Sequence, residues 1–317
     1  MTMKDSLDIQ LVPATQEHRS RIFEISAQVW EGDDYIHNIW EEWLKEGGFF
    51  IILYQGQVAG CAKYTEQLPA EFLMEGLRVD PTYKGKGLAS ATIDRMLEMV
   101  MEKDPKVLRF ATSNDNVVSH HLGKKHGFGF VTSFYFRYLL KEDGWSFPRE
   151  AVDVEAEAVG RKGEGAVEET AVVELGQSDL LEVLDCLEKD PNWPGAKGFL
   201  PRGWVVYQAE PAFLREQLGR GLCLAVKQNG VLQGLLLGDR DQQRPGTRDI
   251  SWLSGNLEIM GQLFLEFMKR AELSGADMVD AKLVSREQLE FLERKGFNRH
   301  PGVESLEIYE KRIHRKP

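Results

Sequence analysis

The sequence of 317 residues predicts an α/β (α+β) fold arranged as two tandem domains. The first observation is a turn at residues 84–87 that joins a short apolar run to a long amphipathic segment, the pattern of a strand, a loop and a helix. The second is a break at residues 142–169, after which the order of strand and helix patterns repeats. The length is sufficient for two domains of ordinary size.

The first half contains strand and helix patterns in alternation. Strands are expected where β-branched and aromatic residues cluster between turn residues, and helices where apolar residues recur at every third or fourth position. The predicted strands are residues 9–12, 49–54, 58–64, 72–79, 107–112 and 131–140. The predicted helices are residues 19–30, 35–44 and 88–102, and a further helical stretch follows residue 116 and ends at residues 126–128.

An acidic segment separates the two halves. Residues 142–169 contain nine acidic and three basic residues, and three glycines lie close together within them. This composition predicts a linker, although the alternating pattern of residues 151–158 also fits an edge strand of the first sheet. We therefore predict a first domain over residues 1–158, an acidic linker over 159–168 and a second domain over 169–317.

The second half repeats the plan in a weaker form. Its predicted strands are residues 172–175, 222–227, 231–237, 250–253 and 279–284, and its predicted helices are residues 178–189, 256–273 and 286–295. Lys295-Gly296-Phe297 near its end matches His126-Gly127-Phe128 of the first half. The turn before its long helix, residues 252–257, has one glycine and no basic residue, unlike residues 84–87.

Composition places the chain among ordinary globular proteins. It is 42% hydrophobic and 28% charged, and no apolar run approaches the roughly 20 residues needed to cross a bilayer. Cys61, Cys186 and Cys223 lack metal-binding spacing, and the first eight residues lack the apolar core of a secretory signal. The net charge of −11 argues against a nucleic-acid partner. We expect a cytoplasmic protein without membrane or nucleic-acid partners, as a monomer or homodimer.

The turn at residues 84–87 has the properties of a diphosphate-binding loop. Gly85 and Gly87 lack a Cβ, so a ligand can approach the backbone closely, and Lys84 and Lys86 add positive charge. The following helix start offers unpaired N–H groups and the positive end of the helix dipole. Neither of the two common nucleotide-binding patterns is present, and a glycine-rich turn before an ordinary helix is the alternative.

This turn resembles the acetyl-CoA loop of the GNAT N-acetyltransferases, Arg/Gln-x-x-Gly-x-Gly/Ala. Here it reads Lys84-Gly85-Lys86-Gly87-Leu88-Ala89, with lysine at the first position. A second family pattern, Asn-x-x-Ala-x-x-Leu-Tyr-x-Lys-x-Gly-Phe, is similar to the stretch that begins at Asn116. The residues at the matching positions are Asn116, Ser119, Leu122, Lys125, Gly127 and Phe128.

The resemblance implies a tandem GNAT architecture. Each domain would hold a mixed, mostly antiparallel twisted sheet flanked by helices, with acetyl-CoA bound by the first domain. Because the turn at residues 252–257 lacks basic residues, the second domain is expected to be degenerate and to form one wall of the acceptor pocket.

The resemblance also implies which residues hold acetyl-CoA. The backbone of the strand before the loop would bind the pantetheine arm, and an N–H of that strand would stabilise the developing oxyanion. The implied residues are Leu77, Arg78 and Val79 for the arm, with Leu77 or Val79 as oxyanion donor, and Lys84, Gly85, Lys86, Gly87, Leu88 and Ala89 for the pyrophosphate. Asn116 would bind the pantetheine amide, with Ser119 near by.

Glu75 is the first candidate for a general base. It lies on the strand that leads to the loop, and burial would raise its pKa toward a useful value. The alternatives are an ion pair with a cation such as Arg78, or exposure to solvent. Glu66 and Asp34 are weaker candidates for the same role.

The sequence departs from the family at the general acid. The family tyrosine that protonates the leaving thiolate corresponds to Gly123 in this chain. Ser119, His120 and Tyr135 are candidates for the acid, and a water molecule is a further alternative.

The segment before the second helix is a candidate acceptor site. Residues 31–36 resemble the corresponding segment of vertebrate enzymes that acetylate histidine, which also carry an Asp-Tyr pair. Asp33 or Asp34 would then hold a cationic acceptor, and Tyr35 would stack on it. The alternative is that Asp33 or Asp34 caps the helix that starts at Tyr35.

Together these patterns predict an acetyl-CoA-dependent N-acetyltransferase that acts on the amine of a small molecule, such as an amino acid or another cationic amine. A non-catalytic acyl-CoA-binding sensor is the alternative, because the family tyrosine is replaced at Gly123 and the second half is degenerate.

Overall fold

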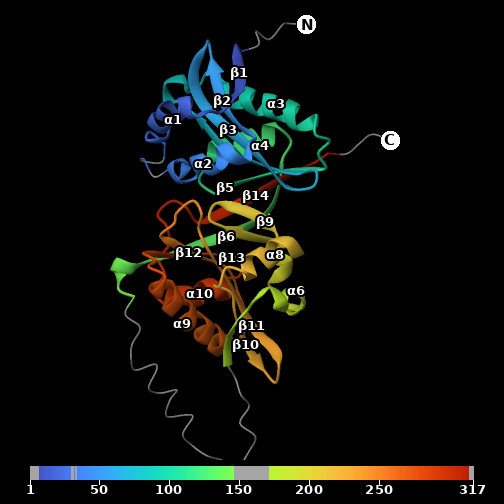
Figure 1. The fold of residues 1–317 in the computed structure, drawn as a ribbon, viewed down its shortest axis with the longest axis vertical. Coiled ribbons are helices and arrows are strands. Elements are labelled where there is room, and N and C mark those ends of the chain that lie inside the picture. Colours follow the sequence, from blue (N-terminus) through green and yellow to red (C-terminus); the bar gives the residue numbers. More distant parts are fainter. Residues whose placement is uncertain (1–6, 30–31, 33, 146–170, 314–317) are drawn as a thin grey trace, which may run out of the picture.

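The computed structural model describes residues 7–29, 32, 34–145 and 171–313. The predicted linker, residues 159–168, and the alternating segment 151–158 lie outside these described residues. Figure 1 shows the first half above the second, with strands of both halves meeting between them.

The first half follows the predicted order of elements closely. Its strands are β1 (Ile9–Pro13), β2 (Phe49–Tyr54), β3 (Gln57–Leu68), β4 (Glu71–Val79), β5 (Val107–Ser113) and β6 (Gly129–Leu140). Its α-helices are α1 (Arg19–Ser26), α2 (Ile36–Glu46), α3 (Leu88–Met101) and α4 (Val117–Lys125).

The second half contains every predicted element and several more. Its strands are β7 (Ala171–Glu174), β8 (Phe199–Arg202), β9 (Val205–Gln208), β10 (Leu224–Gln228), β11 (Val231–Arg240), β12 (Thr247–Leu253), β13 (Met278–Leu283) and β14 (Ser305–Arg312). Its α-helices are α6 (Leu180–Lys189), α7 (Trp193–Ala196), α8 (Pro211–Leu218), α9 (Leu257–Leu273) and α10 (Arg286–Arg294). The sequence patterns did not reveal the β8–β9 hairpin, α7, α8 or β14.

The two halves share one sheet because they exchange strands. The order of the 12-stranded sheet is β1-β2-β3-β4-β5-β14-β6-β13-β12-β11-β10-β7. The last strand of the chain, β14, therefore pairs antiparallel with both β5 and β6, while β6 pairs antiparallel with β13 of the second half. Figure 1 shows β14 crossing between β5 above and β6 below. Neither half completes its sheet with its own strands alone.

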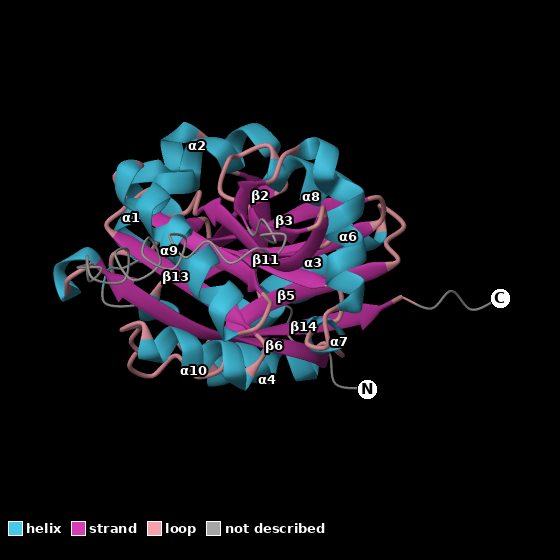
Figure 2. Ribbon diagram, turned by 90° about the horizontal axis from the view of Figure 1, so that it is seen from below, coloured by secondary structure: helices cyan, strands magenta, loops and turns pink. Residues whose placement is uncertain are grey.

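Helices cover both faces of the sheet, as Figure 2 shows. In the first half, Ile51 packs with α1 and α2, whereas its neighbour Ile52 packs with the start of α3 on the opposite face. Leu224 and Ala225 divide in the same way in the second half, toward the α9 side and the α6–α8 side. Successive residues of a strand point to opposite faces, so these strands are apolar on both sides. The mixed, mostly antiparallel sheet flanked by helices confirms the predicted fold class.

Among the described residues, no helix combines the length and the apolar character that a membrane span requires.

Candidate active site

The strands β4 and β5 separate beside the predicted site. They run parallel but pair only from Glu71 and Val107 to Leu73 and Arg109. Beyond Leu73, the edge of β4 that faces β5 has no strand partner among the described residues. An extended ligand can therefore bind there by adding a strand-like set of hydrogen bonds.

A bulge in β4 shapes the middle of this free edge. Glu75 pairs with Lys63 and Arg78 with Cys61, so β4 spans one more residue than β3 over this interval. Gly76 has a φ of +70°, and a Cβ there would lie 2.6 Å from the ring of Trp43 on α2. Glycine is therefore required at this bulge, which changes the direction of the following amides.

The turn after β4 has the form expected of an anion-binding loop. Gly85 and Gly87 have φ values of +81° and +80°, and the turn is exposed. Gly87 is the N-cap residue of α3 and provides no side-chain cap, so the first N–H groups of this helix of 14 residues are left for a ligand. Lys86 Nζ lies 5.1 Å from the centre of the Tyr83 ring, which holds its charge beside the turn.

Both loops of the predicted cofactor site lie at one edge of the sheet. Because β4 and β5 are parallel, the turn at residues 84–87 and the segment after β5 follow the same ends of neighbouring strands. Asn116 is the N-cap residue of α4 there, and its Oδ1 accepts a hydrogen bond of 3.1 Å from the N–H of Ser119. The structure thus places the residues proposed for the pyrophosphate, Asn116 and Ser119 at the same edge of the sheet.

Glu75 lies beside the bulge with a carboxyl group in an unusual environment. Thr65 Oγ1 donates a hydrogen bond of 2.5 Å to Glu75 Oε1. Burial raises the pKa of Glu75 above the ordinary value, while the hydrogen bond from Thr65 and the charge of Lys63 oppose this shift. A raised pKa suits a general base. The weaker candidate Glu66 instead accepts from the N–H of Ala70 in the turn between β3 and β4.

Asp34 and Arg78 form a buried ion pair. Arg78 donates from Nε and Nη2 to the two carboxylate oxygens of Asp34, at 2.9 Å each, and its guanidinium lies 4.9 Å from the centre of the Tyr35 ring. Asp34 Oδ1 also accepts from the N–H of Ile36, the first residue of α2. A cationic acceptor would have to displace Arg78 to reach Asp34. Asp34 contacts the start of α2, but the N-cap residue is Tyr35, and its side chain makes no capping hydrogen bond. Asp33 lies outside the described residues.

The candidates for a general acid lie in different places. A Cβ at Gly123 would collide with the ring of Phe110 on β5, so the family tyrosine has no space here. His120 Nδ1 lies 2.7 Å from the hydroxyl of Tyr309 on β14. Tyr135 lies on β6, which is separated from β4 by β5 and β14, so its strand is about 14 Å from β4 at the usual strand spacing. That distance removes Tyr135 from consideration.

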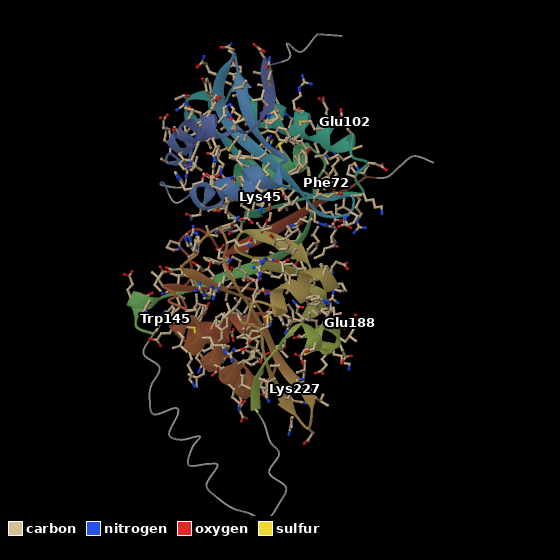
Figure 3. The ribbon with its side chains drawn as sticks, viewed as in Figure 1. Lys45, Phe72, Glu102, Trp145, Glu188 and Lys227 are labelled. Atoms are coloured by element: carbon tan, nitrogen blue, oxygen red, sulfur yellow. The ribbon has the colours of Figure 1, made fainter. Side chains whose placement is uncertain are left out.

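The second half contacts the first half near the end of β3 and the start of α2. Gln67 on β3 donates a hydrogen bond of 3.0 Å to the carbonyl of Val206 on β9, and Asn38 on α2 donates to the carbonyl of Gln243 at 2.7 Å. In Figure 3, Lys45 at the end of α2 and Phe72 on β4 mark the side of the first half that faces the second. The hairpin β8–β9 and the segment at Gln243 thus contact the first half here, and the expectation that the second half forms one wall of the acceptor pocket stays a prediction.

Tyr207 on β9 is the residue of this hairpin that sequence reasoning missed. Its ring stacks on Phe213 at 4.7 Å between ring centres, and the Arg202 guanidinium lies 4.6 Å from its centre. Burial raises the pKa of the Tyr207 hydroxyl; the Arg202 charge opposes this shift, and the charge of nearby Glu75 adds to it. No local pattern marks Tyr207, because only the packing of the two halves brings it near Glu75.

The corresponding place in the second half lacks the properties of a cofactor site. Gln288 on α10 donates to the carbonyl of Leu253 at the end of β12, and Asn256 Oδ1 caps α9 by accepting from the N–H of Ile259. The cavity there, of about 650 Å³, is bordered by several acidic side chains. The side chains of Gln288 and Asn256 thus already bind the backbone groups that a pantetheine arm and a diphosphate would need. The surrounding negative charge also repels phosphate.

Comparison with known proteins agrees with this geometry. Residues 13–128 match the model of the Acetyltransferase (GNAT) family. This match lies within the first half and covers less than half of the chain. A histidine N-acetyltransferase from Scomber australasicus is 33% identical over 102 residues, which are 31% of this chain and 30% of that protein. The match thus spans about a third of the length of that relative.

Solved structures extend the likeness to the whole chain at the level of the fold. A GCN5-related N-acetyltransferase from Sphaerobacter thermophilus superposes with a TM-score of 0.63 at 12% identity, covering 99% of this chain and 98% of that one. A tandem GNAT protein from the clavulanic acid biosynthesis pathway gives a TM-score of 0.60 at 11% identity, with 98% and 100% covered. The chain therefore has a tandem GNAT fold.

Proposed function

We propose that the protein transfers an acetyl group from acetyl-CoA to the amine of a small molecule, at the site between β4 and β5. The observation that carries this proposal is the combination of a free, bulged β4 edge with an uncapped helix start and two lysines in the adjacent turn, within the residues that match the GNAT family model. These features suit an extended pantetheine arm that ends in a diphosphate.

Acetyl-CoA would supply the acetyl group as a thioester. The residues proposed to hold it are the backbone of Leu77, Arg78 and Val79 for the arm, the segment from Lys84 to Ala89 for the pyrophosphate, and Asn116 for the pantetheine amide. The backbone N–H of Leu77 or Val79, redirected by the bulge at Gly76, would stabilise the oxyanion. Holding both reactants in one place contributes about 7–11 kcal/mol to such reactions.

Glu75 is proposed as the base that removes a proton from the acceptor ammonium, directly or through a water molecule. Its raised pKa and its place beside the bulge support this role. Because Tyr309 holds His120 and Phe110 fills the space at Gly123, we assign no side chain as the general acid. Ser119 remains a proposed neighbour of the leaving group.

The acceptor is proposed to be a small cationic amine such as an amino acid. The partial match to a histidine N-acetyltransferase supports this class, as does the pair of carboxylates Glu46 and Glu75 near Tyr207. Tyr35 is a candidate for contact with the acceptor, and Asp34 would act indirectly by fixing Arg78.

A binding experiment followed by a turnover experiment tests the proposal. Calorimetry should show one acetyl-CoA per chain, and Lys84→Ala with Lys86→Ala should weaken binding at least tenfold. Lys189→Ala, an exposed lysine of α6 in the second half, is the matched control and should leave binding unchanged. Absence of acetyl-CoA binding in the unaltered protein would contradict the proposal.

A non-catalytic acyl-CoA sensor is the second candidate, favoured by the lack of space for a tyrosine at Gly123. Release of free CoA thiol across a panel of amines separates the two. An enzyme consumes thioester in the presence of its acceptor, whereas a sensor binds acetyl-CoA without consuming it.

A further inference from the structure

Three buried carboxylates of the second half meet away from the acetyl-transfer site. Asp241 follows β11, Asp249 lies on β12 and Asp280 lies on β13, and each residue is 2% exposed. One ligand oxygen from each lies within 4.8 Å of the others. Asp249 and Asp280 are directly paired in the parallel ladder of β12 and β13, so the register of the sheet fixes their proximity.

One lysine contacts this carboxylate cluster. Lys282 Nζ lies 3.1 Å from Asp249 Oδ1 and 3.3 Å from Asp280 Oδ2. The remaining oxygen of Asp249 accepts a hydrogen bond of 2.9 Å from the N–H of Gly203, in the turn of the β8–β9 hairpin. Each oxygen of Asp249 therefore has one partner, and Asp249 links the cluster to the hairpin.

The other two carboxylates each retain an oxygen without a partner. Asp241 Oδ1 accepts from the N–H of Gln243 at 2.7 Å, but Asp241 Oδ2 is buried and has no hydrogen bond. Asp280 Oδ1 is likewise buried and has no hydrogen bond. A buried polar atom left in this state is costly, and a buried charge more so. A bound cation or a proton at these two oxygens would offset that cost.

Charge and donor chemistry favour a metal ion in this place. Three ionised carboxylates outnumber the contacting ammonium of Lys282, and Arg244 adds a further positive charge near Asp280. A divalent cation would offset the remaining negative charge. Oxygen donors alone, at mutual distances compatible with about 2.0–2.6 Å bonds to one ion, favour the hard cations Mg²⁺, Mn²⁺ and Ca²⁺ over softer metals.

We propose that Asp241, Asp249 and Asp280 bind one hard divalent cation. The ion joins the end of β11 to β12 and β13, and through Asp249 it holds the turn of the β8–β9 hairpin at Gly203. This hairpin carries Tyr207, so the ion also helps to fix the position of Tyr207. The proposal does not depend on acetyl transfer.

Titration of the chelator-treated full chain with Mn²⁺ alone tests this site, with calorimetry for affinity and paramagnetic resonance for the bound ion. We expect one Mn²⁺ per chain and competition by Mg²⁺ or Ca²⁺. Asp241→Asn and Asp280→Asn, which keep the side-chain shape, should each weaken binding at least tenfold. Asp185→Asn, an exposed aspartate of α6, makes the same change of charge elsewhere and should have no effect.

Lys282→Gln distinguishes a cation-binding site from a cluster in which Lys282 alone balances the aspartates. If the ammonium competes with the metal for Asp280, its removal should tighten Mn²⁺ binding. Failure of the unaltered protein to bind Mn²⁺ would overturn the proposal, and so would unchanged Mn²⁺ binding in both aspartate variants. If Asp241→Asn were more stable than the unaltered protein and Mn²⁺ changed the stability of neither, the aspartates would be protonated and would not bind a metal ion.

Discussion

The ring of Phe110 on β5 fills the space into which any side chain at Gly123 on α4 would project. The same ring stacks on Tyr309 of β14, with ring centres 5.0 Å apart and planes within 7° of parallel. Residues far apart in the chain therefore stack in a row beside Gly123, the position that the resemblance matches to the family tyrosine. The packing of these rings leaves no space there for a larger side chain.

Gly123→Tyr should destabilise the protein and should not create a general acid. The new side chain would overpack the contact with Phe110, at a cost of about 1–3 kcal/mol. Chemical denaturation of the two proteins measures the difference. Phe110→Ala in the same chain as Gly123→Tyr opens space and should recover part of the loss. A tyrosine variant as stable as the unaltered protein would show that the space at residue 123 is larger than described.

The Arg78–Asp34 pair should contribute strongly to stability. Asp34→Ala removes the carboxylate that accepts two hydrogen bonds from the buried Arg78 guanidinium, and breaking a buried ion pair typically costs about 3–5 kcal/mol. Asp185→Ala, which breaks an exposed pair with Lys189 on α6, is the control and should change stability by less than about 1 kcal/mol.

Replacing both partners distinguishes the cost of an unpaired buried charge from the contribution of other contacts of the two residues. Asp34→Leu with Arg78→Met removes both buried charges and should be less destabilised than Asp34→Ala alone. Urea denaturation of the three proteins tests this order. If the double variant were the least stable, Arg78 and Asp34 would each matter mainly through other contacts.

Glu75 should make both stability and activity depend on pH. Its pKa is raised in the folded protein, so the folded state binds this proton more tightly than the unfolded state. The stabilising effect of that proton is complete below the unfolded pKa of about 4.5 and is lost as the pH rises through the folded value. Acetyl transfer by the base should show the opposite trend and rise with pH over the same window.

Glu75→Gln removes the titrating group while it keeps the shape and the contact with Thr65. We expect at least a hundredfold loss of kcat/KM, little change in acetyl-CoA affinity, and a flatter dependence of stability on pH. Thr65→Val, which removes the hydrogen bond that opposes the shift, should move the rise in activity to higher pH. A pH profile unchanged by both variants would exclude Glu75 as the base.

Local elements of this protein follow directly from the sequence, whereas contacts between distant residues do not. The periodic segment 88–102 predicts α3, found at Leu88–Met101, and the two glycines of the turn predict its left-handed conformation. The sequence also shows an acidic residue, Asp34, directly before Tyr35. Its partner Arg78 lies 44 positions later, and nothing in either segment indicates that the two side chains meet.

The exchange of β6 and β14 between the halves could not be predicted from the sequence, because it too depends on contacts between distant residues. A strand pattern shows which faces are apolar, but the edges of a strand accept any partner with free backbone groups. Ser305–Arg312 could therefore have paired within the second half, as a tandem repeat suggests. Only the structure shows it between β5 and β6.

This exchange predicts that the first half cannot fold stably alone. A fragment of residues 1–145 lacks β14, so β5 and β6 lose their common partner and two long strand edges are exposed. We expect the fragment to aggregate or to lack cooperative unfolding, and to bind acetyl-CoA at least a hundredfold more weakly than the full chain. Supplying residues 171–317 as a second fragment should restore both properties, because β14 then returns to its place.

Light scattering, thermal unfolding and calorimetry provide the measurements, with the full chain cut at one point within residues 146–170 as control. Cooperative unfolding of residues 1–145 alone, with full affinity for acetyl-CoA, would show that β14 is dispensable for the first half.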